Sequence, residues 1–322
     1  MIFKPVISKE MMEFVKKFDP QIIYCQGYNL TFSWLPVMIA KRFHIPVCFQ
    51  TGDDWPSHLY KKSPLSYIIR PIVNKAVKSL LNISTIRFAN GRLMAEDFGK
   101  RYNMSFEPLM MCDSISRFHA APTRRVVDSD TISIVYTGNL IHGRWASIVD
   151  LCTASKQLKP DGLKIMITVY ANTIPPEAVN KILKMDNLQI HSAPSHEELP
   201  SYLKGADILY LPETMDADMA DEIGLSISTK AHLYMMSARP VLLYGSPITG
   251  IMKYAKEEEW ACIVQEQNLT KLSEAVHKLL TDDVYKKKLV DRGLQVVLKN
   301  HQEDRVREKF LTILNENREL KA

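Results

Sequence analysis

The fold is decided by residues 206–245, ADILYLPETMDADMADEIGLSISTKAHLYMMSARPVLLYG. The apolar run 208–211 predicts a buried strand, and the acidic residues after it predict a solvated loop rather than a metal site. The segment 226–230, SISTK, then opens a predicted helix, since serine and threonine are good N-cap residues. A second apolar run, 241–244, follows that helix at once. A strand, a helix and a strand in this order indicate a βαβ unit of a parallel sheet.

Short apolar runs alternate with helical segments along the whole chain. Continuous apolar runs are typical of parallel strands whose two faces are both covered. We therefore predict an α/β protein with two Rossmann-like, doubly wound parallel sheets. The predicted strands are 22–25, 46–50, 85–88, 108–111, 132–136, 164–169, 188–190, 208–211, 241–244 and 262–264. The predicted helices are 9–18, 30–43, 64–80, 92–101, 145–158, 176–185, 196–203, 229–237, 247–256, 270–281, 283–300 and 303–320.

The chain has 322 residues, which fits two domains better than one core. A polar segment with a proline, AAPTRRVVDSD at 120–130, precedes a fresh strand. We predict a first domain at 1–125, a second at 126–300, and a C-terminal helix at 301–322 that packs back toward the first domain. The first half starts with a helix and yields only three or four strands. We therefore expect a shortened first domain, with the chain beginning partway into it.

The composition is that of a globular protein, with 46% hydrophobic and 24% charged residues. No apolar run approaches the ~20 residues of a membrane span, and the first ten residues do not read as a secretory signal. The five cysteines are scattered and form no C-x-x-C pair. This pattern favours a reducing compartment over a zinc site or a disulfide framework. We therefore expect a cytoplasmic protein with no metal or other cofactor.

The net charge of +5 is distributed unevenly along the chain. Residues 1–125 hold 18 Lys and Arg against 9 Asp and Glu, a net charge of +9. Residues 126–322 hold 23 against 27, a net charge of −4. A basic first half indicates an anionic partner such as nucleic acid, a membrane surface or a lipid phosphate. The alternative is an ordinary scatter of charges on a solvated surface.

Residues 60–81 carry basic side chains interleaved with apolar ones, and the helix predicted there could lie on an anionic membrane. The alternative is a domain helix with a basic face toward solvent, which Pro71 favours because it interrupts the stripe. A nucleic-acid partner is not expected, because the basic residues are not interleaved with exposed aromatics on a recognised module. The basic side chains in question are Lys61, Lys62, Arg70, Lys75 and Lys78.

Two turns at strand ends are candidates for binding an anion. In VYTGNLIHGRW, residues 135–145, a strand runs into Gly138 and Asn139, and a helix with Arg144 follows. Glycine allows the backbone to approach a ligand, a helix start offers N–H donors, and arginine has a forked geometry suited to phosphate. The second turn is 226–230, where Lys230 adds a point charge. The alternatives are an ordinary βα turn with a surface arginine, and a capped helix with an exposed lysine.

Four segments together resemble the retaining glycosyltransferases of family 4, which have the GT-B fold. STKAHLYMMSARPVLLYG, residues 228–245, resembles their donor-site signature, and the stretch 187–245 is the most specific part of the resemblance. The other segments follow the family's order: GYNLTFSWLPVMIAKRFHIPVCFQTGDDW at 27–55, VYTGNLIHGR at 135–144 and NLQIHSAPSHEELPSYLKGADILYLP at 187–212. The resemblance extends over about residues 20–322, so the first domain would hold the acceptor and the second the nucleotide-sugar donor.

The resemblance implies roles for particular residues. Arg144 and Lys230 would be catalytic, because they would stabilise the charge of the leaving diphosphate. Main-chain groups near Ile190–Ala193, which include His191, would hold the base of the nucleotide. The sugar would be transferred with retention and without a metal. The remaining residues that would line the donor are Gly138, Asn139, Ser226, Ser228 and Thr229.

The chain departs from the family pattern at its pair of glutamates. The family often has two glutamates, and the corresponding positions here are Leu225 and Leu233. The ribose contact of the second glutamate is therefore missing. Glu213 and Asp221 have the family's spacing but stand before the helix, and we interpret their spacing as coincidence. Asn139 stands where an arginine is often found.

The acceptor side has its candidates after the strand at 46–50. Asp53 or Asp54 could take a proton from an acceptor hydroxyl, and Trp55 could stack on a sugar face. The alternative is an Asx turn that caps the following segment.

The sequence thus predicts a glycosyltransferase that moves a sugar from a nucleotide-diphosphate sugar to a glycan or lipid-linked acceptor. Its expected setting is surface polysaccharide synthesis in the cytoplasm, with peripheral attachment to the inner face of the membrane. One alternative is a non-catalytic relative that binds nucleotide or glycan, which the missing glutamates favour. The other is a GT-B sugar-nucleotide epimerase.

Overall fold

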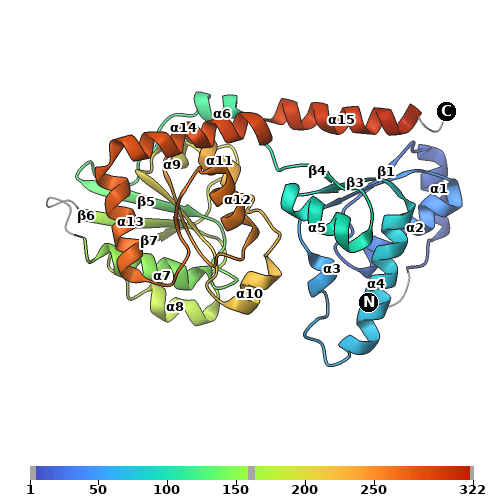
Figure 1. Cartoon of the computed structure of the whole chain (residues 1–322), viewed down its shortest axis with the longest axis horizontal. Helices are drawn as coiled ribbons and strands as arrows, with labels where there is room; N and C mark the ends of the chain where they lie inside the picture. Colours follow the sequence, from blue (N-terminus) through green and yellow to red (C-terminus); the bar gives the residue numbers. More distant parts are fainter. Residues whose placement is uncertain (1–4, 159–163, 320–322) are drawn as a thin grey trace. The chain divides into compact units, whose positions relative to one another are not determined.

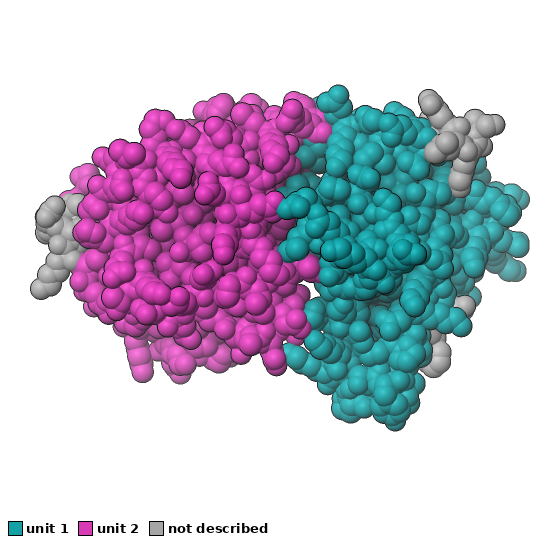
Figure 2. Space-filling view, viewed as in Figure 1, with its two compact units in different colours: residues 1–110, 306–322 teal, residues 111–305 magenta. Residues whose placement is uncertain are grey.

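The computed structural model describes residues 5–158 and 164–319, which form two compact units (Figures 1 and 2). Unit 1 comprises the described residues up to Met110 and from Val306 onward, and unit 2 runs from Met111 to Arg305. The division falls earlier than the predicted boundary at residue 125. Asp113 explains the difference, because it forms a β-bridge with Gln302 and so ties this part of the chain to unit 2.

Unit 1 contains a parallel sheet of four strands in the order β1-β2-β3-β4. The strands are β1 (Ile23–Cys25), β2 (Val47–Thr51), β3 (Ser84–Ala89) and β4 (Glu107–Pro108). The helices are α1 (Lys9–Phe18), α2 (Leu30–Phe43), α3 (Trp55–His58), α4 (Ser66–Ile83), α5 (Arg92–Tyr102) and most of α15 (Glu303–Glu319).

Unit 2 contains a parallel sheet of six strands in the order β10-β9-β8-β5-β6-β7. The strands are β5 (Thr131–Thr137), β6 (Lys164–Tyr170), β7 (Leu188–His191), β8 (Ile208–Pro212), β9 (Val241–Tyr244) and β10 (Cys262–Val264). The helices are α6 (Ile115–Ala120), α7 (Arg144–Ser155), α8 (Pro176–Ile182), α9 (Leu199–Lys204), α10 (Ala217–Glu222), α11 (Ala231–Met236), α12 (Gly250–Glu258), α13 (Leu269–Thr281) and α14 (Asp283–Asn300).

The strand order of unit 2 is that of a dinucleotide-binding fold, with β5 at the centre and the order reversing between β5 and β8. Every residue of β5 and of β8 is buried, as the continuous apolar runs predict. Helix α13 packs on α7 and helix α14 packs on α11, so helices cover both faces of the sheet (Figure 1). The predicted α/β class with two parallel sheets is therefore confirmed.

Three short helices and one helix start differ from the prediction. The segments α3, α6 and α10 have six residues or fewer. They are too short to show a helical periodicity in the sequence. The predicted acidic loop therefore contains a helix, whose first turn is capped by the Asp216 side chain accepting from the Met219 N–H. Helix α11 begins at Ala231 with no side-chain cap, so the expected capping by Ser228 or Thr229 is wrong.

Helix α15 closes the core of unit 1. Cys48, Ile86, Phe88 and Leu109 form a buried cluster on the sheet, and apolar residues of α15 pack against it. The Phe310 ring lies 5.5 Å from the Phe88 ring. The C-terminal helix thus packs on the first sheet as predicted, while residues 320–322 of that prediction lie outside the described residues. In the described part of the chain, no helix combines the length and the hydropathy that crossing a membrane requires.

Replacement of Phe310 by alanine should destabilise unit 1 selectively. Phe310 is half-buried, so we expect a loss of about 1–3 kcal/mol in the free energy of unfolding, below the value for a fully buried phenylalanine. The measurement is urea unfolding of the full chain, followed by a signal that reports on unit 1. Leu311→Ala is the matched control, because Leu311 is the next residue of the same helix and is exposed. Equal effects of the two variants would contradict the packing role of Phe310.

Candidate functional site

The carboxyl ends of β5 and β8 form the point at which strand order reverses in unit 2. In open parallel sheets the loops at such a point diverge and leave a crevice where ligands bind. The loop after β5 begins with Gly138, and the loop after β8 begins with Glu213. The structure therefore brings the predicted turn at 135–145 to the place where this fold binds ligands.

Gly138 makes room for the side chain of Lys230. Its φ of +135° is in the region that favours glycine, and its N–H donates to the Tyr170 carbonyl at 2.8 Å. A Cβ atom built at Gly138 would lie 2.5 Å from Cε and 3.2 Å from Nζ of Lys230. The two predicted donor turns are thus in direct contact. Because its N–H is already bonded, Gly138 contributes space to the site rather than a hydrogen-bond donor.

Arg144 and Glu213 form an ion pair that spans the two loops. Nη2 of Arg144 lies 3.0 Å from Oε2 of Glu213, and the two side chains are 13% and 3% exposed. Nη1 of Arg144 also donates to Oδ1 of Asn139 at 3.4 Å. Nε of Arg144 is buried and has no hydrogen-bond partner among the described residues. The guanidinium therefore retains a donor after binding the carboxylate.

The backbone of Glu213 is fixed from two sides. Its N–H donates to the Tyr244 carbonyl at 2.7 Å, and its own carbonyl accepts from Oγ of Ser147 at 2.8 Å. A Cβ atom at Gly245 would lie 2.7 Å from Cβ of Glu213, so only glycine fits there without displacing it. Glu213 is the residue that the sequence interpretation missed, because its spacing to Asp221 was treated as coincidence. Its position at the end of a fully buried strand is the signal that marks it.

Lys230 is an ammonium held close to a second cation. Burial and, to a smaller extent, the positive charge of Arg144 lower the pKa of Lys230 to about 8, against the opposing effect of the Glu213 carboxylate. No carboxylate in the described part of the chain forms an ion pair with Lys230, and its Nζ lies 5.8 Å from the centroid of the Tyr136 ring. Two cations with one carboxylate make a site that favours an added anion.

The tyrosines around these loops fix the backbone of the site. The Tyr136 hydroxyl donates to the Asn139 carbonyl at 2.6 Å, which shapes the turn after β5. The Thr137 N–H donates to the Tyr234 hydroxyl at 2.9 Å, which attaches α11 to the end of β5. Burial raises the pKa of Tyr234 to about 12, so its hydroxyl stays protonated at neutral pH. These contacts hold Lys230, next to the start of α11, against the β5 loop.

The remaining predicted donor residues differ in their burial and in their hydrogen bonding. Oγ of Ser228 is buried and has no hydrogen-bond partner among the described residues, whereas Thr229 is exposed and Ser226 is half-buried. His191 ends β7, two strands from β5, and its exposed ring lies 5.6 Å from the Tyr170 ring. The Ala193 N–H, predicted to contact the base, donates to Oδ1 of Asn172 at 2.9 Å.

The two acceptor-side carboxylates of unit 1 differ: Asp54 has a structural partner, and Asp53 is exposed. Asp54 is buried and accepts from both terminal nitrogens of Arg101 at 2.7 and 2.9 Å. Its carboxylate is therefore occupied in holding α5 rather than open to a substrate. Asp53 is exposed at the end of β2. Burial raises the pKa of Tyr28, and the charge of Asp53 raises it further, which identifies Tyr28 as a neighbour that the sequence interpretation did not find.

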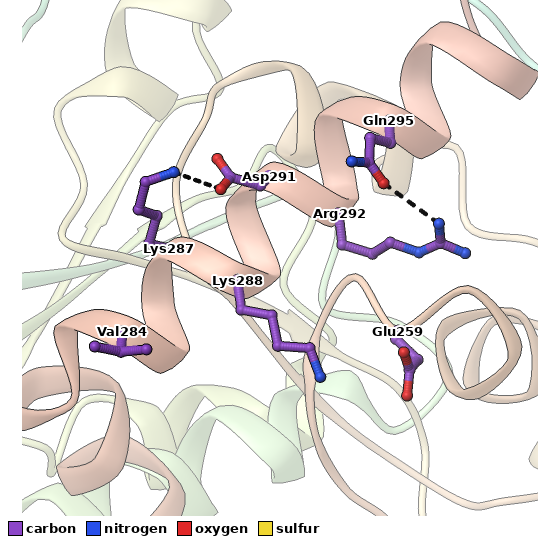
Figure 3. A pocket seen from close by; sticks show the side chains of 7 residues that line it. All are labelled: Glu259, Val284, Lys287, Lys288, Asp291, Arg292 and Gln295. Carbon is purple, nitrogen blue, oxygen red and sulfur yellow. Dashed lines mark hydrogen bonds and ion pairs between the residues drawn. The ribbon is translucent and has the colours of Figure 1, made fainter.

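Two surface hollows lie away from the predicted donor residues. One, of about 440 Å³, lies at the amino ends of β5, β8 and β9, where Arg125 pairs with Asp207 at 2.8 Å. The other, of about 500 Å³, lies beside α14 and is lined by lysines and carboxylates (Figure 3). Neither hollow includes a residue of the β5 or β8 loops. Among the described residues, no group of three or more His, Cys, Asp or Glu side chains could hold a metal ion.

Replacement of Glu213 by glutamine should destabilise unit 2 strongly for an isosteric change. It removes the charge that compensates the buried Arg144, and breaking a buried pair in this way costs about 3 kcal/mol. The measurement is the free energy of unfolding in urea. Glu198→Gln is the control, because Glu198 pairs with Arg124 at 3.9 Å on the surface and its loss should cost less than about 1 kcal/mol. Equal losses in the two variants would refute the structural role of the pair.

The structure is similar to solved structures of known proteins, although its sequence is not similar to any curated one. No protein-family model matches the sequence, and no curated protein sequence matches it. The structure is similar to sucrose-phosphate synthase from Thermosynechococcus elongatus, with a TM-score of 0.71, 13% identity, and coverage of 95% of this chain and 75% of that one. It is similar to Anabaena HepE in complex with UDP and glucose, with a TM-score of 0.69, 10% identity, and coverage of 97% and 84%.

A third similar structure is a glycosyltransferase from Rickettsia africae, with a TM-score of 0.69, 13% identity, and coverage of 96% of this chain and 80% of that one. At these identities the similarity concerns the fold. Both sheets of the chain are parallel, and nearly its whole length superposes on each of these proteins. The chain therefore has the two-domain GT-B fold.

Proposed function

We propose that the chain is a glycosyltransferase that binds a nucleoside-diphosphate sugar in unit 2 and transfers its sugar to a glycan or lipid-linked acceptor. The observation that carries the proposal is the contact between Lys230 and Gly138 beside the Arg144–Glu213 pair. Arg144 and Lys230 thus lie together at the edge of the sheet where folds of this kind bind ligands. Lys230 has no ion-pair partner among the described residues. The UDP and glucose held by Anabaena HepE support the same class of ligand.

The positive charges suit the chemical demand of such a reaction. When the bond between the anomeric carbon and the diphosphate breaks, its electron pair stays on the diphosphate, and negative charge grows there. Lys230 would stabilise this charge as an ammonium and Arg144 as a forked donor. The acceptor oxygen then bonds to the anomeric carbon on the face that the diphosphate leaves, so the configuration is retained. Asp53 is the candidate group to take the proton of the acceptor hydroxyl.

The ribose-binding position is where this chain departs from the family pattern. Leu233 occupies the position of the family's second glutamate and provides no hydrogen-bonding group. Ser228, whose buried hydroxyl has no partner among the described residues, is the candidate to replace it. The biological setting that we propose, surface polysaccharide synthesis at the inner face of a membrane, follows from the resemblance in sequence.

Titration of the full chain with UDP-, GDP- and ADP-linked sugars should show binding of at least one nucleotide class. Lys230→Met should weaken that binding about tenfold or more, because a charge-assisted contact to the diphosphate is lost. Lys271→Met is the matched control, since Lys271 is an exposed lysine paired with Glu266 at 2.6 Å. Absence of binding across the panel would overturn the proposal.

Turnover distinguishes the competing functions once a donor is found. A transferase moves labelled sugar only when an acceptor is added, whereas an epimerase converts the free donor without one. A non-catalytic relative binds the donor and yields neither product. Transfer to an added acceptor is the outcome that we expect.

Diphosphate binding should depend on the protonation of Lys230. Below a pH of about 8 the ammonium is charged and attracts the diphosphate; above it the amine is neutral, so affinity falls by up to about tenfold per pH unit. We expect the Kd for UDP to rise between about pH 8 and pH 10 in the native chain. In Lys230→Arg this rise should vanish, because guanidinium remains charged throughout. Lys271→Arg should keep the rise, and a rise that persists in Lys230→Arg would exclude Lys230 as its source.

A further inference from the structure

The carboxyl ends of β1 and β2 in unit 1 lie in a part of the chain without charged side chains. Residues 20–40 and 45–52 include no Lys, Arg, His, Asp or Glu. These two stretches contain β1, the loop after it, most of α2, and β2. Because β1 and β2 are parallel neighbours, the loops after them lie at the edge where open α/β sheets bind ligands. This edge of unit 1 differs in kind from the predicted diphosphate site, which is built from cations.

Three side chains at this edge form one hydrogen-bonded chain, which we call the amide cluster. Nε2 of Gln26 donates to the Tyr24 hydroxyl at 3.1 Å, and this hydroxyl donates to Oε1 of Gln50 at 2.6 Å. The Tyr24 ring meets the Phe310 ring edge-on at 6.2 Å. The amide cluster is therefore anchored to both strands and to α15, although Tyr24 is 48% exposed.

The amide cluster keeps hydrogen-bonding groups of both kinds for a ligand. A glutamine amide has two N–H donors and an oxygen that accepts twice. Among the described residues, the amide nitrogen of Gln50 and the amide oxygen of Gln26 have no hydrogen-bond partner. The Tyr24 hydroxyl orients both amides, because it binds the oxygen of one and the nitrogen of the other. An oriented donor and an oriented acceptor thus lie on either side of one phenol.

Tyr28 adds an aromatic ring beside the amide cluster. It is 41% exposed, and a Cβ atom built at Gly52 would lie 3.0 Å from its hydroxyl, so the loops after β1 and β2 are in contact. Burial raises the pKa of Tyr28, and Asp53 and Tyr24 raise it further, which identifies both as its neighbours. The ring, the amides and the Asp53 carboxylate therefore belong to one surface.

We propose that the amide cluster and Tyr28 bind a neutral sugar unit of the acceptor. This assignment rests on the proposed function, because it names the substrate that receives the transferred sugar. Sugar hydroxyls both donate and accept, so two neighbouring ones match the N–H groups of Gln50 and the oxygen of Gln26. The C–H face of the same sugar would stack on Tyr28. The hydroxyl nearest Asp53 would pass its proton to that carboxylate as its oxygen bonds to the anomeric carbon of the donor.

The charges at this edge favour a neutral acceptor over a phosphorylated one. A phosphate on the reacting sugar would meet no cation from residues 20–40 or 45–52. It would instead lie near the Asp53 carboxylate, and two negative charges close together repel each other. A neutral sugar uses both amides and the aromatic ring and meets no such repulsion.

Binding of the full chain to an oligosaccharide array tests the acceptor proposal. The array carries neutral oligosaccharides and the same oligosaccharides with a phosphate on the terminal sugar. We expect binding to members of the neutral set and not to their phosphorylated forms. The Kd of the neutral oligosaccharide that gives the strongest signal is then measured by titration in solution.

Three conservative variants test the amide cluster with that oligosaccharide. Gln50→Leu and Gln26→Leu should each weaken binding about tenfold, because each removes a hydrogen bond to the sugar. Tyr24→Phe should weaken it to a similar degree. This variant keeps the ring that packs on Phe310 and removes only the hydroxyl that orients the two amides.

The matched controls remove the same groups elsewhere in unit 1. Gln21→Leu removes an exposed amide just before β1, and Tyr67→Phe removes the hydroxyl of a tyrosine in α4 that is 72% exposed. Both should bind the oligosaccharide like the native chain. The proposal is overturned if no neutral oligosaccharide binds, if the phosphorylated forms bind better, or if the cluster variants bind as well as the controls.

Nucleotide titration of the same preparations separates the acceptor proposal from the proposed function. All the proposed diphosphate ligands belong to unit 2, so the cluster variants should bind nucleotide like the native chain, which also verifies that they are folded. Nucleotide binding without oligosaccharide binding would overturn the acceptor proposal alone. Oligosaccharide binding without nucleotide binding would overturn the proposed function, and with it the role of the amide cluster in holding an acceptor.

Discussion

The ion pair between Arg144 and Glu213 connects the two strands at which the order of the larger sheet reverses. A parallel sheet sends the loops after β5 and β8 toward the same edge, but it does not fix how closely their side chains approach. The buried carboxylate does so. It compensates a guanidinium that is 13% exposed and moderates the repulsion between that guanidinium and Lys230. Without this one negative charge, the positive charges of Arg144 and Lys230 would face each other without compensation, so the arrangement of both loops depends on it.

The sequence predicts the parts of the fold that depend on continuous apolar runs. The strands of unit 2 agree with the predicted ranges to within a residue at each end, because burial on both faces demands uninterrupted apolar residues. The helices with clear periodicity were predicted because each buries one face, which places apolar residues three and four positions apart. The prediction is weakest where a structure is shorter than two helical turns, as in α3 and α10, or where an edge strand such as β4 has only two residues.

The candidate site was predictable in its residue types but not in its contacts. Glycine, arginine and lysine at strand ends indicated an anion site, yet the contact between Gly138 and Lys230 depends on how two distant loops meet. Glu213 differs from the carboxylates that follow it only in standing directly after a buried strand, and its partner Arg144 lies 69 residues away in the sequence. Asp54 shows the reverse case. Its carboxylate resembled a catalytic group in the sequence, and only the fold reveals Arg101, 47 residues away, as its partner.

Because helix α15 belongs largely to unit 1, the two units have all of their residues available at different times during synthesis. Unit 2 is a continuous stretch of chain, whereas unit 1 is built from the first part of the chain and the last. A ribosome making the chain from its amino end completes unit 2 before the residues of α15 that cover Phe88 and Leu109 have emerged. The apolar face of the first sheet therefore lacks the cover of α15 while the second unit is being synthesised. Unit 1 therefore acquires its complete core only after the chain of unit 2 has been made.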